Sequence, residues 1–81
     1  MKARITVTLK SGVLDPQGRA IANALHSLGF GNVEDVRQGK LIEVQLKAAS
    51  EDEARTELDA MCRELLANTV IENYRVELVG G

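Results

Sequence analysis

The stretch Ser11-Gly12-Val13-Leu14-Asp15-Pro16-Gln17-Gly18 marks the point where a strand ends and a helix begins. The carboxylate of Asp15 can accept a hydrogen bond from the first helical turn, and Pro16 supplies a φ suited to the first helical position. Gly18 is unexpected, because glycine inside a helix costs about 1 kcal/mol relative to alanine. Two interpretations stay open: a plain turn with a tolerated glycine, or a close approach of something else to the backbone, such as the backbone of a partner.

Regular apolar spacing lies on both sides of this stretch. Residues 2–10 alternate between apolar and polar side chains, which predicts a half-buried strand. After Asp15, apolar side chains recur at helical spacing, and Gly29 is suited to end the helix in a left-handed conformation. The predicted apolar stripe of this helix consists of Ile21, Ala24, Leu25 and Leu28.

Residues 33–38 follow as a short edge or bulged strand, because Val33 and Val36 are out of phase for a flat one. Gln38 and Gly39 are expected at the tip of a tight hairpin. The hairpin leads into a second clearly alternating strand over residues 41–48.

A second helix begins at Ser50, which forms a capping-box pattern with Glu53. Asn68 is expected to end it in a left-handed conformation. A last strand covers residues 70–79. The helical spacing predicts that one side of the second helix is buried, comprising Ala54, Leu58, Met61, Cys62, Leu65 and Leu66.

The element order strand-helix-strand-strand-helix-strand predicts one domain over residues 1–81. The expected fold is an α+β two-layer sandwich with a four-stranded antiparallel sheet in the order 4-1-3-2 and both helices on one face. The other face of the sheet would be polar and either solvated or covered by another chain. It would carry Arg4, Thr6, Thr8, Glu43, Gln45, Lys47, Arg75 and Glu77.

Composition argues against several classes of function. The 10 basic residues are scattered and are outnumbered by 12 acidic ones, and Phe30 and Tyr74 are the only aromatic residues, so nucleic-acid binding is not expected. We expect no membrane segment and no signal peptide, because no apolar run is long enough and Lys2 and Arg4 interrupt the first strand. A cytoplasmic protein is the expectation.

The residue pattern indicates no catalytic or metal site. His26 has no evident nucleophile or carboxylate partner, although Asp35 or another chain could supply one, and we expect a surface or boundary histidine. Cys62 falls on the buried side of the second helix, where a thiol acts as a small hydrophobic group. A single cysteine also gives neither a disulfide nor a metal cluster.

Three segments together resemble a known family: residues 12–20 leading to Leu25-His26-Ser27-Leu28-Gly29, residues 33–40, and residues 65–74. In this order and spacing they are similar to PurS, the small subunit of the bacterial and archaeal phosphoribosylformylglycinamidine synthase of purine biosynthesis. Thr69 stands where that family commonly has proline, which would leave this turn less rigid.

The resemblance implies a non-catalytic assembly subunit that binds a large synthetase subunit and a glutaminase subunit and supports ammonia transfer between them. It also implies a homo-oligomer, a dimer or a tetramer. ATP and Mg²⁺ would be used by the synthetase, and no cofactor would be bound by this chain. The residues that match the family's loop-to-helix motif, with one histidine nearby, become candidates for contact with a partner: Asp15, Pro16, Gln17, Gly18 and His26.

Two other functions fit the same element order. A regulatory module that binds a small molecule at a dimer interface would have the same strand-helix arrangement. A small phosphatase of the acylphosphatase kind would need an arginine in a phosphate-binding loop after the first strand, and the first arginine after that strand is Arg19, inside the helix.

Overall fold

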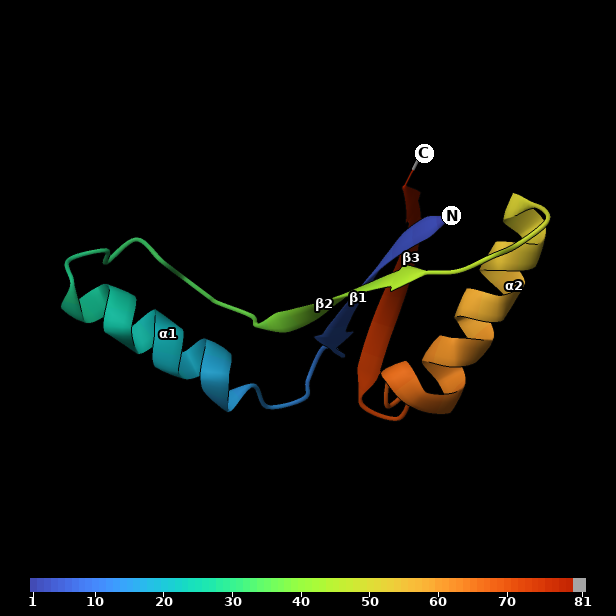
Figure 1. Cartoon of the computed structure of the whole chain (residues 1–81). Helices are drawn as coiled ribbons and strands as arrows, with labels where there is room; N and C mark the ends of the chain where they lie inside the picture. Colours follow the sequence, from blue (N-terminus) through green and yellow to red (C-terminus); the bar gives the residue numbers. More distant parts are fainter. Residues whose placement is uncertain (80–81) are drawn as a thin grey trace.

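The computed structural model describes residues 1–79 and contains a three-stranded antiparallel sheet with two helices. Figure 1 shows the sheet in the middle, with one helix beside it and the other projecting away. In chain order the elements are β1 (Lys2–Leu9), α1 (Pro16–Ser27), β2 (Gly39–Gln45), α2 (Glu51–Met61), the π-helical turn η1 (Cys62–Leu66) and β3 (Glu72–Val79).

The sheet has the order β2-β1-β3, so β1 pairs with both of the other strands. Lys2 of β1 lies opposite Gln45 of β2 and opposite Val79 of β3. The strands predicted over residues 70–79, 2–10 and 41–48 are therefore neighbours in this order, as expected. The prediction of a fourth strand, over residues 33–38, is wrong. Residues 33–38 do not pair with the sheet but run beside α1, so the predicted hairpin at Gln38 and Gly39 is also absent.

The placement of the helices differs from the prediction as well. α2 packs on the sheet, whereas α1 lies beyond its end and does not cover it (Figure 1). The chain is consequently elongated, with a longest dimension of 50 Å and a radius of gyration of 16.1 Å. A compact domain of this length would have a radius of gyration of about 12 Å.

The core lies between α2 and the face of β1 that its alternating pattern predicts. Ile5 and Leu58 are fully buried, and Cys62 is buried beside them. The remaining buried members of this core are Ala3, Val7, Ala54 and Ala67. Because burial of apolar area is the main favourable term in folding, this small cluster holds the sheet and α2 together.

The last turn of the second helix contains one residue more than the regular α-helix that the sequence predicts. The N–H of Ala67 donates to the carbonyl of Cys62 over five residues, so η1 widens the last turn. Leu65, predicted to be buried, is 83% exposed, whereas Ala67 is buried. Asn68 does not adopt a positive φ; its carbonyl accepts from the N–H groups of Ile71 and Glu72 and turns the chain into β3.

Side-chain hydrogen bonds complete the attachment of α2. Ser50 Oγ accepts from the N–H of Glu53 at 3.1 Å, as the capping pattern predicts. Asp59 accepts from the hydroxyl of Tyr74 on β3 and from Arg63 Nε at 2.8 Å. The Tyr74 hydrogen bond lowers the pKa of Asp59 and raises the pKa of Tyr74. This contact fastens α2 to the edge strand β3.

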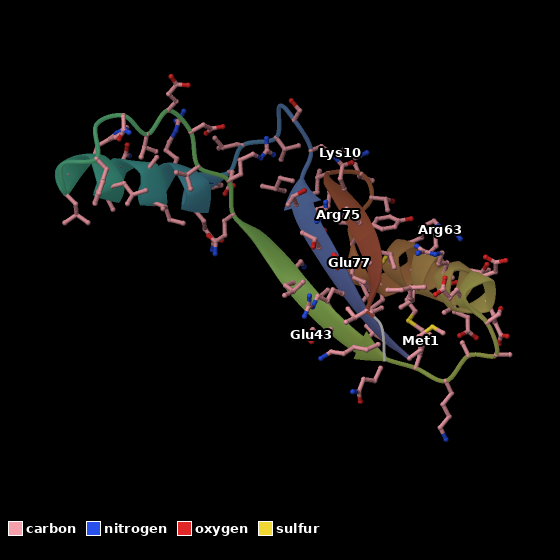
Figure 2. All side chains as sticks on the ribbon, turned by 90° about the horizontal axis from the view of Figure 1, so that it is seen from above. Met1, Lys10, Glu43, Arg63, Arg75 and Glu77 are labelled. Carbon is pink, nitrogen blue, oxygen red and sulfur yellow. The ribbon has the colours of Figure 1, made fainter. Side chains whose placement is uncertain are left out.

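The other face of the sheet is polar, as predicted, and within residues 1–79 neither helix packs on it. Arg4 in the central strand lies opposite Glu43 of β2 and opposite Glu77 of β3. Lys2 Nζ forms an ion pair with Glu43 at 2.8 Å, which lowers the pKa of Glu43. Figure 2 labels Glu43, Arg75 and Glu77 along these two strands. Among residues 1–79, no helix is both long and apolar enough to cross a bilayer.

The shifted register of η1 predicts that two leucines of the second helix differ sharply in their contribution to stability. Leu58→Ala removes a fully buried side chain, and we expect a loss of about 2–5 kcal/mol in the free energy of unfolding. Leu65→Ala is the matched control, and we expect a change of less than about 0.5 kcal/mol. Urea unfolding measures both. Equal losses would contradict the π-helical turn.

Candidate partner-contact site

Asp15 holds two separate segments of the chain with its two carboxylate oxygens. Oδ1 accepts from the N–H of Gly18 at 2.9 Å and so caps α1, as the sequence predicts. Oδ2 accepts from the N–H of Gln38 at 2.9 Å, just before β2. These backbone hydrogen bonds, with the one to Gln38 first, lower the pKa of Asp15. The cap therefore also fixes where β2 begins.

Gly18 is buried because the backbone of this same chain passes close to it. A Cβ atom at Gly18 would overlap the carbonyl oxygen of Val36 and would lie 2.8 Å from Asp15 Oδ2. Of the two interpretations left open by the sequence, the close approach of another backbone is correct, and that backbone belongs to residues 33–38. Glycine at this position lets α1 and residues 33–38 lie directly against each other.

Arg37 completes this junction and was not singled out by the sequence. Its Nη2 donates to the carbonyl oxygens of Leu9 and Lys10, where β1 ends. The sequence pattern placed Arg37 in an edge strand, so nothing there indicated a contact with residues 9 and 10. We use "the junction" for Asp15, Gly18, Arg37 and Gln38, and "the arm" for residues 16–38, which the junction holds to the sheet.

His26 lies near the other end of α1, and its ring makes a hydrogen-bond contact with backbone. Its Nε2 is 2.7 Å from the carbonyl oxygen of Val33. The carboxylate of Asp35, which the sequence left open as a partner for His26, instead accepts from the N–H of Val36. His26 is exposed, which confirms the expected surface position. Its described contacts fasten α1 to residues 33–38 and do not form an acid–base pair.

A shallow cleft of about 370 Å³ runs along the arm between α1 and residues 34–37. Asp15 and His26 line it at opposite ends, and the side chains between them carry mixed charge. A second cavity of about 280 Å³ is lined by Gln17 together with Val7 and Leu9 of β1, and by Asp15 and Gln38 of the junction. The lining of the first cleft includes Arg19, Asn23, Glu34 and Arg37.

The structure brings four of the five candidate residues together and sets one apart. Asp15, Pro16, Gln17 and Gly18 form the first turn of α1, while His26 lies at its far end. Pro16 and Gln17 are exposed, whereas Asp15 and Gly18 serve contacts within the chain. Their contact with a partner stays a prediction.

The described part of the chain, residues 1–79, contains no cluster of histidine, cysteine and acidic side chains that could hold a metal ion. Cys62 is fully buried, and this burial raises the pKa of its thiol. A buried thiol with a raised pKa is a poor nucleophile, because the thiolate is the reactive form.

Comparison with known proteins identifies one family. Residues 2–80 match the family model PurS, described as phosphoribosylformylglycinamidine (FGAM) synthase. A PurS subunit of this synthase from Synechocystis is 53% identical over 75 residues, which cover 93% of this chain and 75% of the relative. The crystal structure of Methanocaldococcus jannaschii PurS has a TM-score of 0.85 at 42% identity, covering 94% of this chain and 92% of that one.

A further similar structure is PurLQS from Thermotoga maritima. The matching chain is 34% identical with a TM-score of 0.86, and the match covers 94% of this chain and 93% of that chain. In each case the agreement extends over nearly the full length of this chain. The open arrangement with a projecting arm is therefore compatible with experimentally determined folds of related chains.

The lowered pKa of Asp15 predicts that the junction opens in acid. A carboxylate with a depressed pKa stabilises the folded state above the unfolded value of about 3.9, and that contribution is lost as the pH falls through the lower folded value. The amide chemical shifts of Gly18 and Gln38 should therefore titrate together, below pH 3.8.

Asp15→Asn is the control for this titration. An asparagine can still accept from Gly18 through its carbonyl oxygen, but its NH₂ group cannot accept from Gln38. We expect the acid-dependent shift to vanish and the Gln38 amide to exchange faster with solvent. Separate titrations of the two amides in the unmodified chain would contradict the shared carboxylate.

The contact at Gly18 predicts that even the smallest side chain is harmful there. Helix propensity alone would make Gly18→Ala stabilising by about 1 kcal/mol. We expect a net loss of about 1–3 kcal/mol instead, because the new Cβ must displace the Val36 carbonyl. Gly31→Ala is the control, since a Cβ atom at Gly31 would have nothing within 4 Å of it. A stabilised Gly18→Ala chain in urea unfolding would show that the contact is loose.

Proposed function

This chain belongs to the PurS family, and on that basis we propose that it serves phosphoribosylformylglycinamidine synthase as an assembly subunit without catalytic groups of its own. As a PurS chain it is a subunit of that synthase. The synthetase and glutaminase subunits are its partners, in keeping with the PurLQS complex of the Thermotoga maritima relative. We propose that the chain acts in the cytoplasm.

The main structural support for the assembly role is the projecting arm. Residues 16–38 project from the sheet along the 50 Å dimension of the molecule and are held at a fixed point by the junction. A projecting element with exposed side chains presents surfaces for protein contact, and rigid attachment keeps those surfaces in a defined orientation. The exposed Pro16 and Gln17 lie at its base.

The chemistry of the candidate residues supports a role without bond making. Both carboxylate oxygens of Asp15 accept from backbone N–H groups, and His26 contacts a carbonyl oxygen. General acid–base catalysis needs such groups directed at a substrate. From its membership of the family we propose that ATP and Mg²⁺ are used by the synthetase subunit and that this chain binds no cofactor.

The benefit of assembly would be geometric. Ammonia released by the glutaminase must reach the activated amide of the substrate before the ammonia is lost into bulk water or is protonated. Holding two active sites close raises the local concentration of the transferred molecule. The alternative of a small-molecule regulatory module has no comparable support, because the matched relatives are subunits of one synthase.

The test is reconstitution with the synthetase and glutaminase subunits of the same organism, supplied with ATP and substrate. We expect turnover with glutamine only when this chain is added, and turnover with ammonium chloride whether or not it is added. Glutamine-driven turnover in its absence would contradict the assembly role.

In the same assay, His26→Ala distinguishes a partner contact made by His26 from a catalytic role of His26. A lost partner contact raises the concentration of chain needed for half-maximal activity, and the maximal rate stays within about twofold of the unmodified value. A maximal rate that stays low at saturating chain would assign a catalytic role to His26 and overturn the proposal.

A further inference from the structure

Three apolar side chains lie exposed where the second helix ends and the chain turns into β3. Leu65 in η1 is 83% exposed, Val70 in the following turn is 81% exposed, and Ile71 is 39% exposed. We call these three residues the apolar corner. Burial of apolar area is the main favourable term in folding and in association, so side chains left in water are available to stabilise a contact with another protein.

The exposure of Leu65 follows from the π-helical turn. The extra residue of η1 places the small side chain of Ala67 in the core and leaves the larger Leu65 outside. Such turns are rare, and they occur frequently at functional sites. The irregular end of the helix thus directs a leucine toward solvent.

Hydrogen bonds hold the apolar corner in one shape. The carbonyl of Asn68 accepts from the N–H of Ile71 at 3.0 Å, and its Oδ1 accepts from the N–H of Val70 at 3.2 Å. The N–H of Lys10 donates to the carbonyl of Ile71 at 2.8 Å and ties the turn to the end of β1. A surface that is already ordered loses little conformational entropy on binding.

The helix that leads to the apolar corner is acidic. Of the 12 acidic and 10 basic side chains of the chain, residues 51–66 hold six and two, respectively. Glu57 and Glu64 are exposed and form no ion pair within residues 1–79. This charge repels nucleic-acid phosphates and anionic lipids, and it attracts lysine and arginine side chains.

The charge also argues against a second copy of this chain as the occupant. In a two-fold contact the same surface of each copy meets itself, so the acidic side of α2 would face another acidic side. Like charges placed together across an interface are costly. A different protein with a basic surface fits this side of the molecule better.

The apolar corner is well separated from the arm. Figure 1 and Figure 2 both show α1 and the helix formed by α2 and η1 at opposite ends of the molecule, with the strands between them. The longest dimension is 50 Å, so two proteins can be bound at once. A subunit that joins two larger proteins needs two surfaces, and the arm provides one of them.

We propose that the apolar corner is a second docking surface, which binds the synthase subunit that the arm does not contact. Its occupant offers an apolar pocket for Leu65 and Val70, bordered by lysine or arginine side chains that face the acidic side of α2. The two partners are those of the proposed function, on which this assignment rests.

The first test removes apolar surface without changing the charge. The Leu65→Gln/Val70→Ser chain is titrated into fixed amounts of the synthetase and glutaminase subunits, with ATP, substrate and glutamine. We expect the concentration of chain needed for half-maximal turnover to rise about tenfold or more, with the maximal rate within about twofold. Leu41→Gln is the matched control, at a 59% exposed leucine of β2, and should change neither value more than about twofold. No rise for the double variant, or an equal rise for the control, would overturn the docking surface.

Light scattering on the isolated chains checks for self-association. Because both side chains are exposed, the Leu65→Gln/Val70→Ser chain should stay folded and keep the mass of the unmodified chain. A lower mass would place the apolar corner against a second copy of the chain and would overturn the docking surface.

The second test identifies the partner at each surface by photocrosslinking in the assembled synthase. Leu65→Cys and Gln17→Cys chains carry a thiol-reactive benzophenone, and the unmodified chain is the control because its Cys62 is buried. We expect position 65 to crosslink to one of the two larger subunits, and position 17, at the base of the arm, to the other. Crosslinks from both positions to the same subunit, or from position 65 to a second copy of this chain or to no protein, would overturn the docking surface.

Failure of the docking surface and failure of the proposed function give different results. If the unmodified chain does not support glutamine-driven turnover, the proposed function is contradicted, and the docking surface with it. If the unmodified chain supports turnover and Leu65→Gln/Val70→Ser does so at the same concentration, the docking surface alone is contradicted.

Discussion

The carboxylate of Asp15 is the interaction on which the shape of this molecule depends. One oxygen closes the first turn of α1, and the other holds Gln38 at the start of β2. A single side chain thus joins the entry and the exit of the arm at one point. A carboxylate can accept several hydrogen bonds, and both donors to Asp15 are backbone groups, so these two bonds need no other side chain.

The core contributes stability but does not decide where the arm lies. Ile5, Leu58 and Cys62 bury the contact of β1 with α2, and the ladders on either side of β1 hold the sheet together. α1 takes no part in this core. The molecule therefore has two parts, a small packed sandwich and a projecting arm, and the proposed assembly role rests on the surfaces of the arm.

Local patterns in the sequence predicted the elements well, and their long-range placement poorly. The alternation in residues 2–10 and the Asp15-Pro16 pair identify β1 and the start of α1, because both signals are local. Periodicity shows which side of a helix is apolar, but not which chain covers it. The prediction therefore placed a fourth strand and a second covering helix on one sheet, and residues 1–79 have neither.

For the site, the cap at Asp15 was predictable, and its second acceptor role was not. The bond to Gln38 and the contacts of Arg37 join residues more than twenty positions apart, and no spacing rule connects them. The misplaced Leu65 has a different cause. One extra residue in a helical turn rotates everything after it, and helical periodicity assumes a constant pitch.

The position of β1 at the centre of the sheet has a consequence for how the protein folds during synthesis. Lys2 is synthesised well before Val79, its neighbour in the sheet. Closing so long a loop is entropically costly, and pairings of distant residues are slow to form. The edge of β1 that pairs with β3 therefore stays unpaired until β3 has been made, and an unpaired strand edge is open to aggregation in this interval.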